Sequence, residues 1–195
     1  MRITRSCMGS LIWDGSLNIV EDFMPRGPLL PVEFCRVSRG GRLTLAIDEA
    51  FGAPCSTYIA MSACSDLNAA MDNLWIREGS HDEVLPKKLR THGRVGFVEV
   101  APGFCSAKAM ERHPNSVATL MTWAQANGFD AAIWTAPASN FYEPNKMGEP
   151  FPAAAAIRYL EALDEKNVVA ALRTGCARGS YQAREDVHDL VLPRW

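Results

Sequence analysis

The chain of 195 residues has no apolar run of the roughly 18 residues that a membrane-spanning helix needs. Arg2 and Arg5 stand near the N-terminus as in a secretion signal, but Gly9, Ser10 and Asp14 interrupt the apolar residues that follow them. We therefore expect a cytoplasmic protein without a membrane partner.

An excess of positive charge is also missing. The 20 lysines and arginines are balanced by 22 acidic side chains, which gives a formal net charge of -2. The densest basic group is Lys87, Lys88 and Arg90, which is too small for the electrostatic attraction to phosphates that nucleic-acid binding requires. No nucleic-acid partner is expected.

Motifs for metal binding and redox chemistry are absent as well. The six cysteines form no CxxC pair, and none lies close to a histidine in the sequence. We therefore predict no metal site and no cofactor, and we interpret the cysteines as reduced and mostly buried. They are Cys7, Cys35, Cys55, Cys64, Cys105 and Cys176.

The composition supplies enough apolar material for a core. Hydrophobic residues make up 48% of the chain and charged residues 22%, as in ordinary globular proteins. This length suits one domain, so residues 1–195 are predicted to form a single domain. The oligomeric state is left open.

Short strands separated by turns are predicted for much of the chain. A strand at 2–8 ends at Gly9 and Ser10, and strands at 32–38 and 42–48 form a hairpin around Gly40-Gly41. Further strands are expected at 56–62, 94–100 and 129–135.

Three helices are predicted between these strands. The first begins at Asp66 with Ser65 as its N-cap, and its apolar residues recur with helical spacing. The second covers about 116–127 and ends at Asn127-Gly128, and the third runs through 152–163 with Pro152 in its first turn.

Glu78 falls on the apolar stripe of the first predicted helix. Leu67, Met71 and Leu74 precede it with helical spacing, which places the carboxylate on the core-facing side. Burial and the negative end of the helix dipole both favour the protonated acid, which suits general acid-base catalysis. If the helix ends before Arg77, Glu78 is instead an ordinary solvated residue.

A second candidate feature is the turn Met8-Gly9-Ser10-Leu11 at the end of the first strand. Successive backbone N–H groups in such a turn can hold a carboxylate or a polarised carbonyl oxygen. The alternative is a plain turn whose apolar neighbours pack inward.

Several segments taken together resemble a known family. They are Gly9-Ser10-Leu11-Ile12-Trp13, the strand that holds Arg36 and Ser38, the core strand at 43–47, and the helix leading from Asp66 to Arg77-Glu78. Their order is similar to that in γ-glutamylcyclotransferase-like proteins, most of all the ChaC-type branch, where a Tyr-Gly-Ser-Leu loop follows the first strand and a catalytic glutamate follows a helix. The resemblance covers roughly the first 80 residues. One departure is Met8 in place of the family tyrosine, which keeps the apolar bulk but lacks the hydroxyl.

This resemblance implies an α+β fold, a small mixed β-barrel with flanking helices. It implies an enzyme of lyase or transferase type, as in glutathione metabolism, that converts a small γ-glutamyl amine or peptide to 5-oxoproline and a free amine. Gly9, Ser10 and Leu11, together with Met8, would bind the γ-glutamyl group, and Glu78 would be the general acid and base. No metal or cofactor is implied, and the identity of the leaving amine stays open.

Two other functions are compatible with the sequence. Met8 also fits a catalytically silent protein that binds γ-glutamyl compounds or amino acids on the same fold. A cysteine-dependent hydrolase is the third hypothesis, although no nucleophile elbow surrounds any cysteine.

Other polar residues carry weaker signals. Trp134 and the segment 139–142 could line a pocket, but a buried Trp134 beside a surface loop is favoured. His81, next to Asp82 and Glu83, is interpreted as part of a solvated loop.

Overall fold

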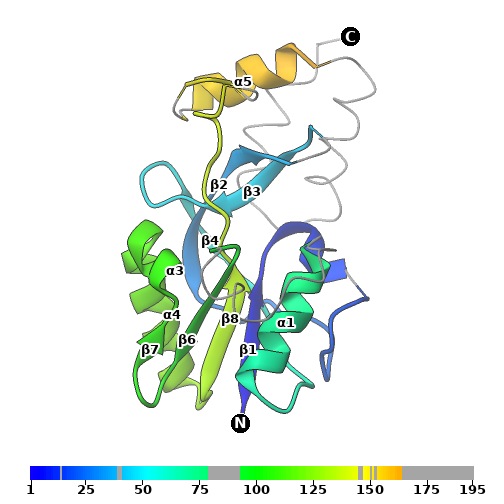
Figure 1. Ribbon diagram of the computed structural model, residues 1–195, viewed down its shortest axis with the longest axis vertical. Helices are drawn as coiled ribbons and strands as arrows, with labels where there is room; N and C mark the ends of the chain where they lie inside the picture. The colour runs from blue at the N-terminus through cyan, green and yellow to red at the C-terminus, as the bar shows by residue number, and fades with distance from the viewer. Residues whose placement is uncertain are drawn as a thin grey trace. The chain divides into compact units, whose positions relative to one another are not determined.

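The computed structural model describes residues 1–13, 15–38, 41–78, 93–144, 147–149, 151 and 153–163. Within these residues the protein is a mixed α/β structure with eight strands in two sheets and four α-helices (Figure 1). The predicted mixture of helices and strands is confirmed. No closed barrel is seen among the residues described, so the barrel implied by the resemblance stays a prediction.

The larger sheet has five strands in the order β5-β1-β8-β6-β7. These are β1 (Ile3–Cys7), β5 (Tyr58–Met61), β6 (Val95–Glu99), β7 (Phe104–Cys105) and β8 (Ala131–Thr135). β1 runs parallel to β8, and the other neighbouring strands are antiparallel. The central strands β1 and β8 are buried, although β1 carries the polar residues Thr4, Arg5 and Ser6.

Helices cover this sheet. The helix α1 (Leu67–Arg77) packs on one face, where its buried side chains join Ile3 and Cys7 of β1 and Ile133 of β8 in one apolar cluster. Because strand side chains alternate between faces, Trp134 points to the other face, where it lies against Gly96 of β6. The helices α3 (Ala107–Arg112) and α4 (Pro114–Ala126) contact β6, and α4 also contacts β8.

The smaller sheet has the order β3-β2-β4, with β2 (Leu29–Val37), β3 (Leu43–Ile47) and β4 (Ala53–Ser56). β2 and β3 form the predicted antiparallel hairpin, with a register irregularity between Glu33 and Arg36. The helix α5 (Ala153–Glu161) buries Ala155, Ala156 and Leu160 in a cluster with residues of both strands.

The chain divides into two compact units. One consists of Met1–Leu30 and Ser56–Ala138, and the other of Pro31–Cys55 with the chain from Ser139 onward. Every residue of the predicted functional site belongs to the first unit.

Most predicted elements are present, but the strand expected at 56–62 is wrong. It is divided at Thr57 into the end of β4 and the whole of β5, which belong to different sheets. The reason is that the side chain of Thr57 is buried and makes hydrogen bonds that are not part of a strand ladder. Its Oγ1 donates to the Pro28 carbonyl at 2.8 Å and accepts from the Ser6 hydroxyl at 3.2 Å.

Two further boundaries differ from the prediction. The N-cap of α1 is Asp66 rather than Ser65, because the Asp66 carboxylate accepts the Ala69 N–H at 2.9 Å. The second predicted helix starts at Pro114, and the short elements α3 and β7 before it were not predicted. The third predicted helix corresponds to α5, and His81, Asp82 and Glu83 lie outside the described residues.

Candidate functional site

The predicted loop is a short 3-10 helix, η1 (Gly9–Trp13), that follows β1 after a single residue. Gly9 adopts φ 61°, a left-handed conformation that costs residues with a side chain free energy and suits glycine. The first N–H groups of any helix have no acceptor within it, so the amides of Gly9, Ser10 and Leu11 are the donors available at this turn. Met8 is buried.

The second predicted element, α1, forms because its cap and its apolar spacing agree. Asp66 satisfies an N–H at the first turn, and Leu67, Met71 and Leu74 are buried along one side. Glu78 is the C-cap, and its own N–H donates to the Leu74 carbonyl at 3.1 Å. The helix itself ends at Arg77, so Glu78 caps it rather than lying within its last turn as predicted.

Packing brings the loop and the helix together. Leu11 of η1, Cys7 of β1 and Leu74 of α1 belong to one core cluster. Leu74 lies one helical turn before Glu78, so the C-terminal end of α1 is held beside the strand end from which the loop starts. The candidate residues Met8 to Leu11 and Glu78 thus come from neighbouring elements of one compact unit.

The carboxylate of Glu78 is neither deeply buried nor freely solvated. Its Oε1 lies 2.7 Å from Nη1 of Arg77, and the side chains of both residues are 20% exposed. The two charged groups therefore form a partly exposed ion pair at the end of α1. Residues next to each other on a helix do not ordinarily face one another, so this pair depends on the side-chain conformations at the end of α1.

The pKa of the Cys7 thiol depends on the charged groups in this region. Burial raises the pKa of its thiol to about 12, the guanidinium groups of Arg5 and Arg77 lower it, and the carboxylate of Glu78 raises it. Cys7 therefore stays protonated at neutral pH. The contribution of Glu78 also shows that its charge acts on the residue directly before Met8 and the loop.

The other buried thiols do not support the hypothesis of a cysteine-dependent hydrolase. Burial raises the pKa of Cys35 to about 12 and also raises that of Cys55. Cys7, Cys35, Cys55, Cys64 and Cys105 are free thiols, and Cys176 lies outside the described residues. Cys64 is half-buried, unlike Cys7, Cys35 and Cys55.

The weaker polar candidates are mostly structural. Trp134 is 1% exposed and belongs to the core, as favoured from the sequence. Asn140 is buried rather than part of a surface loop, because its side chain accepts the Val37 N–H at 2.8 Å and donates to the Val37 carbonyl at 3.0 Å. Among the residues with described positions, no group of His, Cys, Asp and Glu side chains could hold a metal ion.

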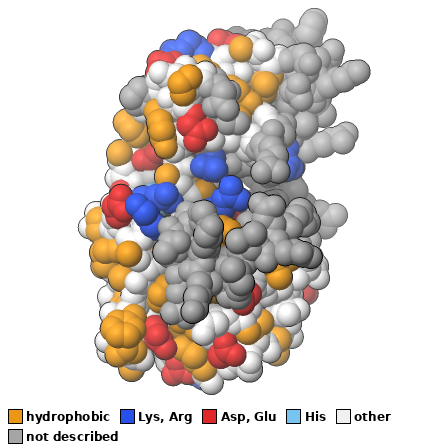
Figure 2. Space-filling view, in the orientation of Figure 1, with side chains coloured by type: hydrophobic (Ala, Val, Ile, Leu, Met, Phe, Trp, Pro, Cys, Tyr) orange, Lys and Arg blue, Asp and Glu red, His pale blue; other side chains and the backbone are white. Residues whose placement is uncertain are grey.

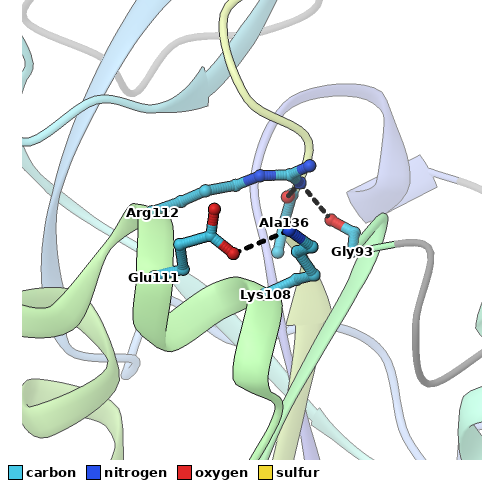
Figure 3. A network of polar contacts seen from close by, with 5 residues as sticks. All are labelled: Gly93, Lys108, Glu111, Arg112 and Ala136. Carbon is cyan, nitrogen blue, oxygen red and sulfur yellow. Dashed lines mark hydrogen bonds and ion pairs between the residues drawn. The ribbon is translucent and has the colours of Figure 1, made fainter.

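The charges on the surface have both signs. Basic and acidic side chains both occur on the face drawn in Figure 2. A close-up of one polar network shows Arg112 of α3 donating to the carbonyls of Gly93 and Ala136, with Lys108 and Glu111 paired beside it (Figure 3). These carbonyls lie next to the start of β6 and the end of β8, so Arg112 connects α3 to the sheet by hydrogen bonds. None of the described helices has the length and apolarity that crossing a membrane would need.

Sequence reasoning missed one functional group, the guanidinium of Arg5. It is fully buried on β1, on the same face as Ile3 and Cys7. Alternation along the strand 2–8 could have indicated this, because Ile3, Arg5 and Cys7 are spaced two residues apart.

Comparison with known proteins gives no match. No protein-family model, no curated protein and no solved structure matches the chain. The resemblance found in the first 80 or so residues therefore stays a prediction.

Proposed function

We propose that this chain is a γ-glutamylcyclotransferase-like enzyme with a barrel-like α+β fold. It would convert a γ-glutamyl amine or peptide to 5-oxoproline and the free amine. The observation that carries this proposal is the shared packing of Leu11 and Leu74, because Leu11 belongs to the loop and Leu74 lies one turn before Glu78. This supports a single site, because both predicted halves pack into the same core cluster.

The reaction needs only one proton carrier. The α-amino nitrogen of the γ-glutamyl group attacks its own γ-carbonyl carbon, and a five-membered ring closes. Glu78 would first remove a proton from the ammonium group and later deliver a proton to the leaving nitrogen as the old amide bond breaks. The nucleophile and the carbonyl belong to one molecule, so the enzyme mainly has to hold the folded substrate.

The loop would supply the electrostatic part of catalysis. The amides of Gly9, Ser10 and Leu11 would donate hydrogen bonds to the oxygen that gains negative charge as the ring closes. Gly9 supports this role because its left-handed φ turns the chain at the start of η1. Met8 would contribute apolar contact and no hydrogen bond.

The Arg77 guanidinium would position the Glu78 carboxylate for proton transfer through their ion pair at 2.7 Å.

The direct test is incubation of the protein with a panel of γ-glutamyl amides, followed by chromatography for 5-oxoproline. We expect release of 5-oxoproline and amine in equal amounts without added metal. The variant Gly9→Ala should lower this turnover, because it strains the loop by about 1–2 kcal/mol. Gly128→Ala is the control, since Gly128 has a similar φ of 68° but ends α4.

A catalytically silent binding protein is the second candidate, favoured by Met8 at the family's tyrosine position. Calorimetry separates the two, because a binding protein would give heat with γ-glutamyl compounds and leave every one of them intact. A cysteine hydrolase would lose its activity after thiol alkylation, whereas the proposed enzyme would retain it.

A further inference from the structure

Arg5 is a buried cation. It lies on β1 between Ala60 of β5 and Ile133 of β8, and its exposed fraction is 0%. Buried arginines are normally paired with carboxylates, because an isolated charge is costly to remove from water. Of the residues that the structure describes, no Asp or Glu pairs with Arg5.

The hydrogen bonds of Arg5 are incomplete. Its Nη2 donates to the Ser62 hydroxyl at 3.2 Å and to the sulfur of Cys64 at 3.5 Å. Its Nε and Nη1 are buried and have no partner within the described part of the chain. A guanidinium has five N–H donors and keeps its charge, so Arg5 has unused donors for an anionic acceptor.

Cys64 is the group best placed to become that acceptor. It lies two residues before Asp66, the N-cap of α1, and its own N–H donates to the Ser62 hydroxyl at 3.2 Å. Its side chain is half-buried, whereas Cys7, Cys35 and Cys55 are buried. Burial lowers the pKa of Arg5, and Cys64 and then Cys7 oppose this effect, so the sulfur of Cys64 is the strongest electrostatic partner of the guanidinium.

We propose that Cys64 is a site of reversible oxidation by hydroperoxides, and that its sulfenate product is held by Arg5. In this step the sulfur attacks the outer peroxide oxygen as its thiol proton is lost. An S–O bond forms, the O–O bond breaks, and with hydrogen peroxide the departing hydroxide takes up the thiol proton as water. The resulting sulfenic acid loses its own proton to solvent to become the sulfenate. The thiol is oxidised by two electrons and the peroxide is reduced by two.

The structure gives a reason for selectivity and for retention of the product. Thiol reactivity depends on access, and the sulfur of Cys64 is half-buried and lies 3.5 Å from Nη2 of Arg5. The sulfenate oxygen would accept hydrogen bonds from donors of Arg5 that the thiol leaves unused. Cys105, which is also half-buried, is the natural internal comparison because it lies on the edge strand β7.

The test is exposure of the full-length protein to limiting hydrogen peroxide, with dimedone as the sulfenate trap and peptide mass spectrometry as the readout. We expect the label on Cys64 to form several-fold faster than the label on Cys105, and a thiol reductant added before dimedone should abolish it. Equal labelling of the two residues would overturn the proposal, and this comparison needs no variant.

Variants then assign the effect to the guanidinium. Arg5→Met keeps the length of the side chain and removes the charge, so the rate of Cys64 labelling should fall toward that of Cys105. If circular dichroism shows that Arg5→Met is unfolded, Arg5→Lys takes its place. It keeps the charge but loses the planar set of donors, so the fraction of Cys64 that dimedone can trap should fall faster when its addition after peroxide is delayed. Unchanged labelling and an unchanged sulfenate lifetime in the folded variant would contradict the role of Arg5, and Cys64→Ser should remove the labelled peptide.

Discussion

Oε1 of Glu78 lies 2.7 Å from Nη1 of Arg77, the residue that precedes it at the end of α1. Both side chains keep a fifth of their surface exposed. Ion pairs with this degree of solvent access contribute about 0–1 kcal/mol to stability. The stability effect of losing the Glu78 charge is therefore small, which allows a catalytic effect to be measured separately.

The first prediction concerns Glu78→Gln. Glutamine keeps the shape of the side chain but cannot carry a proton, so turnover of a γ-glutamyl amide should fall by about 10²- to 10⁴-fold. The melting temperature should change little. Glu111→Gln on α3 is the matched control, because it also removes the carboxylate of a 2.7 Å ion pair, with Lys108, but should leave turnover unchanged. Equal turnover by the two variants would show that Glu78 carries no proton.

The second prediction separates the two possible caps of α1. Asp66→Ala should lower the melting temperature, because it leaves the Ala69 N–H without its acceptor, whereas Ser65→Ala should have a much smaller effect. Thermal unfolding followed by circular dichroism measures both. A larger decrease in melting temperature from Ser65→Ala would indicate that Ser65 is the N-cap, as expected from the sequence.

The same cap gives a pH dependence. Hydrogen bonds from the Ala69 N–H and the Ser65 hydroxyl hold the pKa of Asp66 below its ordinary value of 3.8. A carboxyl with a lowered folded pKa stabilises the protein above its unfolded pKa and loses this effect as pH falls through the folded one. The difference in melting temperature between the wild type and Asp66→Asn should therefore shrink as pH falls below about 4.

The elements that could be predicted from the sequence are those with local signals. α1 has a cap and helical spacing, α4 ends at Asn127 with Gly128 in a left-handed conformation, and the hairpin of β2 and β3 surrounds glycines. Each signal lies within a few residues of the element that it specifies, so no knowledge of tertiary contacts is needed.

The features that could not be predicted depend on partners distant in the sequence. Thr57 ends a strand because of bonds to Ser6 and Pro28, and Arg5 is buried through contacts with Ser62 and Cys64. For the site, apolar spacing located Glu78, but the ion pair with Arg77 depends on side-chain conformation at the end of the helix.

The third prediction concerns alkaline pH. Burial raises the pKa of Cys7 from 9.0 to about 12 in the folded protein. An acid with a raised folded pKa contributes its full stabilisation below the unfolded pKa and loses it as pH rises toward the folded one. One such thiol lowers the free energy of unfolding by up to about 1.4 kcal/mol per pH unit in this range.

Urea unfolding of the wild type and Cys7→Ala at pH 8, 9 and 10 tests this. Cys7→Ala should be less stable than the wild type at pH 8 because it leaves a small cavity. This gap in the free energy of unfolding between the two proteins should narrow as pH rises. Val98→Ala is the control, since Val98 is buried and does not titrate, so its gap should stay constant. A constant gap for Cys7→Ala as well would mean that the buried thiol does not contribute to the alkaline dependence.

The last prediction tests the attachment of α3 to the sheet. Gly93 and Gly103 both have left-handed backbones, with φ values of 65° and 87°. Alanine at either position costs about 1–2 kcal/mol of conformational strain. A Cβ on Gly103 would meet no atom within 4 Å, whereas one on Gly93 would come within 2.7 Å of Arg112 Nη1 and 2.8 Å of Lys108 Cβ.

Gly93→Ala should therefore reduce the free energy of unfolding more than Gly103→Ala, by at least about 1 kcal/mol, because Arg112 must give up its bonds to the Gly93 and Ala136 carbonyls. Urea unfolding gives both values. In an Arg112→Ala background those bonds are already absent. The additional loss in free energy of unfolding caused by Gly93→Ala should therefore be smaller, because only the close contact with Lys108 remains. An excess of the same size in both backgrounds would show that Arg112 contributes nothing to this attachment.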